Sequence, residues 1–125
     1  MLRAPLFLAL ALLAGCERTP FPASGTPKPS QVGDPRRGAR LIAWFGCGSC
    51  HTLREIPGAA GVVGPPLDGV GRRVYIVGML RNTPDNLVRW ISHPQSVVPG
   101  NVMPDMGIDY ADARDIAAYL YTQKE

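Results

Sequence analysis

The sequence predicts an all-α fold of three to four helices. Three segments begin with a side chain that caps a helix N-terminus, at Asp34, Thr83 and Asp109. In each segment, apolar residues recur at the spacing of one helix face. No segment alternates apolar and polar residues in the way a half-buried strand does. Glycine and proline collect between these segments, which predicts irregular connections.

The first 15 residues are typical of an export signal. Arg3 supplies a positive charge, and residues 5–13 form an apolar run that is too short to span a bilayer. The Leu-Ala-Gly-Cys sequence at residues 13–16 is similar to a bacterial lipobox, which implies that Cys16 is diacylated and becomes the first mature residue. The alternative is cleavage near Ala14 that leaves Cys16 as a free thiol. Lipidation is favoured because an exposed unpaired thiol is a liability in an exported protein.

Residues 16–32 are predicted to be a flexible tether that carries the lipid. Prolines lie here among serine, threonine and glycine, and this composition cannot bury a core. In an extended polyproline conformation the segment reaches on the order of 50 Å. The folded domain is then expected to cover residues 33–125.

The first helix is predicted to begin at Asp34-Pro35, with Asp34 as the N-cap and proline at the first helical position. Apolar residues then follow helical periodicity as far as Phe45, and Gly46 ends the helix. Gly38 lies inside this helix, where glycine costs about 1 kcal/mol relative to alanine. A helix tolerates that cost where another element must approach closely.

A Cys-Gly-Ser-Cys-His pentapeptide at residues 47–51 follows directly and matches the attachment motif of c-type haem. In this interpretation Cys47 and Cys50 form thioethers with the haem vinyl groups, and His51 ligates the iron. The chain has 3 cysteines, one for lipid and two for haem, and an odd number does not favour a disulfide framework. A thioredoxin-like redox pair requires a nearby βαβ pattern, which is absent, and a structural zinc site lacks a fourth ligand.

Residues 52–71 are rich in glycine and proline and are predicted to form a loop. Within it, Gly64-Pro65-Pro66-Leu67 offers carbonyl oxygens that proline leaves free to accept. A metal-bound histidine usually donates its second ring N–H to such a group. A rigid turn without this role is the alternative.

Two further helices complete the prediction. One begins at Thr83-Pro84-Asp85 and is stopped by Pro94, and the last runs from an Asp109 cap to about Thr122. A shorter helix is expected over residues 74–81, with Met79 in the core.

Met103 is the best candidate for the second axial ligand. It lies in a loop stiffened by Pro99, Gly100 and Pro104, and a thioether raises the reduction potential of the iron. Met106 is a weaker rival. His93 is a further rival, although its place at a helix end has a simpler explanation in the helix dipole.

Four features, in this order, resemble a small bacterial class I cytochrome c over residues 33–123. They are the Gly33-Asp34 helix start leading to the Cys47–His51 motif, the Gly64–Leu67 segment, the Pro99–Pro104 loop, and the Ile116–Leu120 stretch of the last helix. The resemblance implies a cytochrome c fold wrapped around one covalent haem c, with His51 and Met103 as axial ligands. It also implies that the Pro65 carbonyl accepts from His51 and that Leu67 contacts the haem.

The family's first and last helices cross on a glycine, so the resemblance places Gly38 against Ile116 and Tyr119. Candidates for binding the haem propionates follow from side-chain chemistry, and arginine is favoured because the family has one after the proline loop. They are Arg72, Arg73, Tyr75 and Trp90. A domain this small has little core of its own, so the chain without haem is expected to be largely unfolded.

The formal net charge of +3 does not indicate a nucleic-acid binder. Basic residues dominate residues 33–103 and acidic ones residues 104–125, an asymmetry that either orients docking or is an ordinary solvated surface. The expected function is a monomeric carrier of single electrons between respiratory-chain partners, anchored by lipid to the periplasmic or outer face of a bacterial membrane. Family analogy favours a terminal oxidase as acceptor.

Two alternatives to this function remain. The first is a haem subunit of a larger dehydrogenase or oxidase complex. The second is a haem enzyme or gas sensor with a displaceable methionine, for which Asp105 is the nearest acid–base group.

Overall fold

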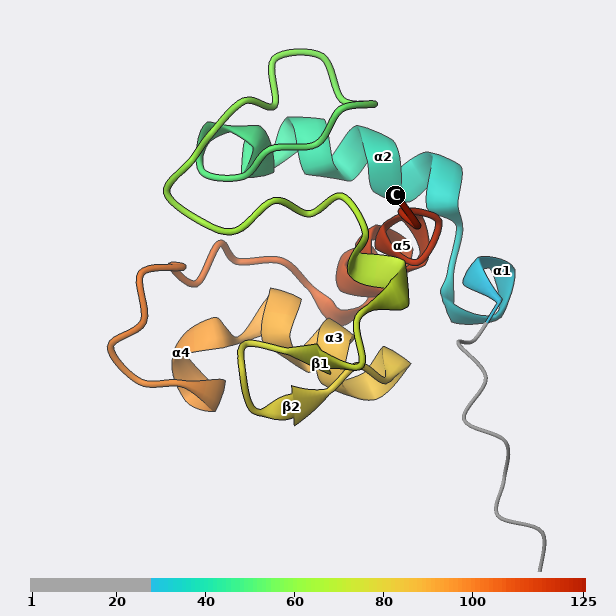
Figure 1. Ribbon diagram of the computed structural model, residues 1–125. Coiled ribbons are helices and arrows are strands. Elements are labelled where there is room, and N and C mark those ends of the chain that lie inside the picture. The colour runs from blue at the N-terminus through green and yellow to red at the C-terminus, as the bar shows by residue number, and fades with distance from the viewer. Residues whose placement is uncertain (1–27) are drawn as a thin grey trace, which may run out of the picture.

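The computed structural model describes residues 28–125 (Figure 1). The predicted signal segment, the lipobox with Cys16 and the tether up to residue 27 lie outside the described residues. The last part of the predicted tether is folded, because Pro29–Val32 forms the short helix α1. Val32 is buried, and its carbonyl oxygen accepts from Nε of Arg114 at 2.7 Å. The expectation of a tether up to residue 32 is therefore corrected, and the folded part begins before Gly33.

Helix α2 (Pro35–Trp44) and helix α5 (Tyr110–Leu120) form the centre of the fold, with α2 lying across α5 (Figure 1). Both begin at the predicted caps. The Asp34 carboxylate accepts from the backbone N–H groups of Arg36 and Arg37, and the Asp109 carboxylate accepts from that of Asp112. These bonds satisfy donors that a helix start leaves free.

The two helices touch at Gly38, as the sequence predicts. A Cβ added there would overlap the carbonyl group of Asp115 and press on the Cβ of Tyr119. Tyr119 is thus the predicted neighbour, whereas the backbone of Asp115 takes the place expected for Ile116. Because only a glycine permits this approach, the interior glycine fixes where the helices cross.

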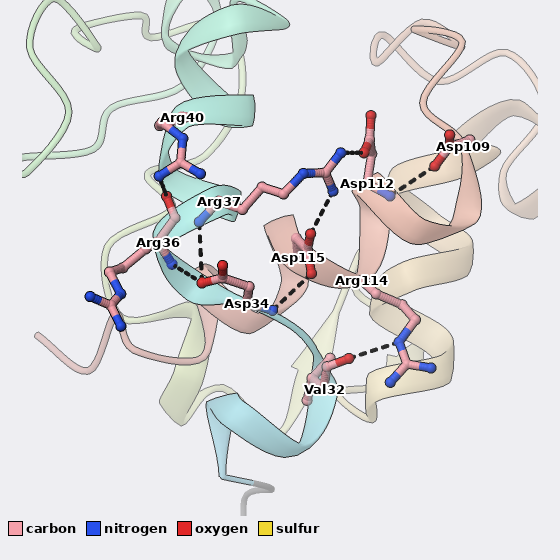
Figure 2. Close-up of polar contacts among 9 residues, drawn as sticks. All are labelled: Val32, Asp34, Arg36, Arg37, Arg40, Asp109, Asp112, Arg114 and Asp115. Carbon is pink, nitrogen blue, oxygen red and sulfur yellow. Dashed lines mark hydrogen bonds and ion pairs between the residues drawn. The ribbon is translucent and has the colours of Figure 1, made fainter.

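Ionic contacts hold the same two helices together on the outer side (Figure 2). The Arg37 guanidinium donates to the carboxylates of both Asp112 and Asp115, and Asp115 also accepts from the backbone N–H of Asp34 at 2.8 Å. We call Asp34, Arg37, Asp112 and Asp115 the α2–α5 clamp. It joins one basic residue of α2, Arg37, to two acidic residues of α5, Asp112 and Asp115.

Helix α3 (Pro84–Ser92) packs on α5 and is followed by a new short helix, α4 (Pro94–Val97). Thr83 caps α3 as predicted, and its hydroxyl accepts from the N–H of Asn86. Pro94 ends α3 and also occupies the first position of α4, where its missing N–H costs nothing. Two single-turn 3₁₀ helices, Cys47–Ser49 and Val70–Arg72, lie in the connections.

The expected helix over residues 74–81 is wrong. This segment is an antiparallel hairpin of β1 (Tyr75–Ile76) and β2 (Leu80–Arg81). Val77 and Gly78, at the turn, have φ angles of 47° and 73°. Positive φ at both central residues is typical of a tight hairpin turn and ends a helix. Met79 is exposed at this turn, so its expected place in the core is also corrected.

Tyr121, directly after α5, connects the end of that helix to the hairpin region through a hydrogen bond. Its ring is fully buried and its hydroxyl donates to Oδ1 of Asn82 at 3.1 Å. The Asn82 amide donates in turn to the carbonyl oxygens of Val70 and Arg73. Burial, with a contribution from the charge of Asp85, raises the pKa of Tyr121 to about 12.

Candidate functional site

The Cys47–His51 motif forms a tight turn directly after α2. Gly46 has a φ of 70°, a conformation that ends a helix, and the N–H of His51 donates to the carbonyl of Cys47 at 3.0 Å. Cys47 and Cys50 are free thiols and partly buried. Burial raises the pKa of the Cys47 thiol.

His51 is oriented by the carbonyl oxygen of Pro65, which lies 2.7 Å from Nδ1. Since a carbonyl only accepts, Nδ1 carries the proton and donates it. Nε2 is then the nitrogen with a free lone pair, as a metal ligand requires. The contact expected between the proline loop and the histidine is therefore present.

Gly64 lies flat against the same imidazole ring. A Cβ added at Gly64 would overlap Cε1, Nδ1 and Nε2 of His51. Gly61 packs in the same way on the backbone of Ser49 and Cys50. The loop thus encloses the motif through contacts that side chains would prevent.

The motif opens into a cavity of about 430 Å³. Its walls come from α2, the proline loop, the hairpin, α3, the Met103 loop and α5, and they are mostly apolar. The lining residues that bear on the site include Cys47, Cys50, His51, Gly64, Pro65, Leu67, Arg73, Trp90, Met103 and Met106.

Met103 is held at the cavity by two amide side chains. Nε2 of Gln95 donates to the carbonyl oxygens of Met103 and Asn101, at 2.7 and 2.9 Å. Oδ1 of Asn101 accepts from the N–H of Met103 at 2.7 Å, and its amide donates to Pro94 and Val98. Sequence reasoning missed both amides. Their one signal in the sequence is that each is an amide side chain within eight residues of Met103.

Comparison with known proteins decides the family. No protein-family model matches the sequence. Cytochrome c2 of Rhodopila globiformis is 39% identical over 105 residues, which cover 74% of this chain and 95% of that protein. The chain belongs to the class I c-type cytochromes. It is an electron carrier, and the family implies covalently bound haem c.

Two further similarities support less, because one covers only part of the relative and the other has low sequence identity. Cytochrome c oxidase subunit 2 of Alkalihalophilus pseudofirmus is 35% identical over 91 residues. That match covers 70% of this cytochrome but only 25% of the oxidase subunit. The crystal structure of SoxXA from P. pantotrophus has a TM-score of 0.59 at 20% identity, with 81% of this chain and all of that chain covered. This last likeness supports the all-α cytochrome c fold alone.

The residues of the cytochrome fit a haem. Two thiols and an imidazole adjoin an apolar cavity, and the glycine against the ring of His51 leaves the imidazole free of side-chain overlap on that face. Among residues 28–125, no three His, Cys, Asp or Glu side chains gather as a metal-ion site would need. The same residues contain no helix long and apolar enough to cross a membrane.

The rivals to Met103 differ in position. Met106 also lines the cavity, although it is exposed, whereas His93 is exposed and does not line it. Asp105 is absent from the lining as well, and its carboxylate accepts from the N–H of Gln95 at 3.4 Å. The structure therefore brings no acid–base residue to the cavity wall at this loop.

The four propionate candidates separate into two groups. Arg73 and Trp90 line the cavity, whereas Arg72 and Tyr75 do not. Nη2 of Arg73 donates to the carbonyl oxygens of Pro66 and Asp68. Arg72 is exposed. The Tyr75 ring lies against the Arg81 guanidinium, whose Cζ atom is 5.9 Å from the centre of the ring. Arg73 and Trp90 are thus the candidates within reach of a bound group.

Proposed function

We propose that this cytochrome is a membrane-tethered monohaem carrier that passes single electrons between respiratory-chain partners. Cys47 and Cys50 would attach the haem through thioethers, and His51 and Met103 would ligate its iron. The observation that supports this best is that an oriented imidazole and a methionine whose main chain is held by hydrogen bonds line the same cavity. The haem, when bound, supplies an iron that alternates between Fe(II) and Fe(III).

The protein's own residues tune and protect that centre. The Pro65 carbonyl keeps the His51 ring in one tautomer and raises its basicity as a ligand. Gln95 and Asn101 hold the Met103 loop through hydrogen bonds with main-chain atoms of Pro94, Val98, Asn101 and Met103, which fixes the main chain that carries the sulfur. The apolar walls limit water, and a methionine ligand in such surroundings raises the reduction potential.

We place the carrier at the periplasmic or outer face of a bacterial membrane, anchored through a lipid on Cys16. The export signal and lipobox pattern of the sequence support this location. A single anchored residue followed by a proline-rich segment suits a domain that moves between partners.

A terminal oxidase is the acceptor that we propose. The likeness to part of an oxidase subunit 2 supports it, because a domain similar to this chain forms a quarter of that subunit. The same likeness favours a second arrangement, in which this cytochrome is itself a stable subunit of an oxidase or dehydrogenase complex. Co-purification from detergent-solubilised membranes separates the two, since a mobile carrier is recovered alone.

The assignment of the axial ligand is tested by Met103→Ala in the haem-loaded protein. We expect haem to stay attached, the reduction potential to fall by on the order of 0.1 V or more, and CO or cyanide to bind. The weak long-wavelength band of sulfur bound to Fe(III) should disappear. Absorption spectra and a redox titration measure these changes.

Met106→Ala is the matched control, because Met106 lines the same cavity three residues away. It should leave the band and the potential unchanged. An unchanged potential in Met103→Ala would transfer the assignment to Met106 or His93, and ready CO binding by the unmodified protein would favour the enzyme or sensor instead.

A further inference from the structure

Part of the surface around the cavity opening carries no formal charge. Two stretches, residues 62–66 and 99–104, border the opening, and neither contains Asp, Glu, Lys or Arg. Val63 and Val102 line the cavity and are 65% and 80% exposed, so they lie where it meets solvent. We call these two stretches the uncharged rim.

The uncharged rim extends outward as apolar surface. Val62, next to Val63, is 88% exposed and does not line the cavity, and the prolines at 65, 66, 99 and 104 are exposed as well. The longer segments that contain the rim and the haem motif, residues 41–53, 56–67 and 90–104, are also free of acidic residues, lysine and arginine. Such a patch on a monomer marks a surface for interaction.

Some of the charges that the sequence suggested for docking are used elsewhere. Arg37 faces Asp112 and Asp115 within the α2–α5 clamp (Figure 2), so part of the basic and acidic asymmetry is neutralised inside the fold. Arg73 is the charged residue of the cavity lining, and it donates to the backbone carbonyls of Pro66 and Asp68. Neither group lies on the rim.

We propose that the uncharged rim docks a redox protein whose own electron-transfer face is uncharged and apolar. The inference rests on the proposed function, because it names the partner class of the same haem site. A charged partner face would lose hydration at this rim without gaining an opposite charge, whereas an apolar face loses only ordered water. Association of this kind is not steered by charge, so its rate does not depend on salt.

The test measures electron transfer from the reduced, haem-loaded cytochrome by stopped flow. The probes are two blue-copper proteins, one with an uncharged apolar face over its copper and one with an acidic face. With the first probe, the rate constant should change by less than about twofold between about 10 mM and about 500 mM ionic strength. The acidic probe should react more slowly than the uncharged one.

Val62→Lys places one positive charge on the rim, and Val74→Lys is the matched control. Val74 is 64% exposed and is absent from the cavity lining, so both changes add the same net charge. Val62→Lys should slow reaction with the uncharged probe by about fivefold or more, and Val74→Lys should change it by less than about twofold.

Equal effects of the two lysine variants, or faster reaction with the acidic probe that falls steeply with salt, would overturn the proposal. Dimerisation of the cytochrome in sedimentation, abolished by Val62→Lys, would assign the rim to a second copy and overturn it too. The haem spectrum of the unmodified protein distinguishes failure of the proposed function from failure of the uncharged docking. If the haem spectrum lacks the methionine band, the proposed function fails. A normal spectrum with steep salt dependence refutes only the uncharged docking.

Discussion

At the scale of single residues, His51 is fixed on two sides at once. The Pro65 carbonyl holds the edge of the ring through Nδ1, and Gly64 lies against the ring atoms. The first contact sets which nitrogen carries the proton, and the second leaves no room for a larger residue. Orientation of the ligand is therefore built into one short loop.

Gly64→Ala tests the second contact. The new methyl group overlaps the His51 ring, which cannot turn away without losing its bond to Pro65, so we expect a loss of about 2 kcal/mol or more in the free energy of unfolding. Chemical denaturation of the haem-loaded protein, followed by circular dichroism, measures it.

Gly58→Ala provides the comparison, because a Cβ there meets nothing within 4 Å although φ is 79°. Its cost should be about 1 kcal/mol, from backbone strain alone. Equal losses in the two variants would mean that contact with the histidine ring contributes nothing.

The sequence was informative at this scale wherever chemistry demands one residue type. Thioethers need cysteines and the iron needs an imidazole and a soft ligand, so Cys47, Cys50, His51 and Met103 stood out from spacing and composition. Gln95 and Asn101 did not stand out in the sequence, because their amides form hydrogen bonds with backbone atoms whose positions depend on the loop conformation. Which arginine reaches the cavity likewise depends on where the 3₁₀ helix Val70–Arg72 ends.

At the scale of elements, the crossing of α2 and α5 combines a close backbone contact with ionic contacts. Gly38 brings the helices together, and the α2–α5 clamp holds them beside that point (Figure 2). Partial burial raises the pKa of Asp115, but the Arg37 side chain and the N–H of Asp34 outweigh this, so its pKa lies below the usual value.

This lowered pKa predicts a pH dependence of stability. Because the folded state holds the Asp115 proton more weakly than the unfolded state, the stabilisation is present above the ordinary aspartate pKa of about 4 and is lost as pH falls through the lower folded value. Asp115→Asn should be less stable than the unmodified protein near pH 7, and the difference should shrink below about pH 4.

Urea denaturation at a series of pH values measures that difference. Glu125→Gln, at the exposed C-terminus, should follow the unmodified protein throughout. A difference that stays constant down to about pH 2 would contradict the role given to the Asp115 charge.

Helices with a strong start were predictable, and short elements were not. Asp34, Thr83 and Asp109 cap α2, α3 and α5, so local hydrogen bonds placed those ends. The hairpin at Tyr75–Arg81 was missed because its apolar residues fit a helix face equally well and only the φ angles of Val77 and Gly78 decide against it. Helix α1 depends on packing against α5, which is remote in sequence.

At the scale of the whole molecule, the helices surround a cavity that adjoins the hydrophobic core. Side chains from both ends of the described chain, such as Ile42 and Leu120, line it. An apolar space of about 430 Å³ is far larger than the voids of a well-packed interior. A bound haem would therefore complete the core.

Preventing haem attachment should accordingly unfold the domain. In the double variant Cys47→Ala, Cys50→Ala, we expect most of the helical signal in far-ultraviolet circular dichroism to be lost at 25 °C. The single variant Cys47→Ala keeps one thiol for attachment and should retain most of its helix. A double variant with full helix content and cooperative unfolding would show that the protein part is stable by itself.

Helix α2 also separates helix α1 from the Cys47–His51 motif. Helix α1 precedes its first residue and the Cys47–His51 motif follows its last, so about 15 Å of helix lies between them. Immobilising the protein on an electrode through its N-terminal end would leave the cysteine–histidine turn a helix length from the support. Helix α2 thus separates the point of attachment from the Cys47–His51 turn, so immobilisation at the N-terminal end does not obstruct electron transfer at that turn.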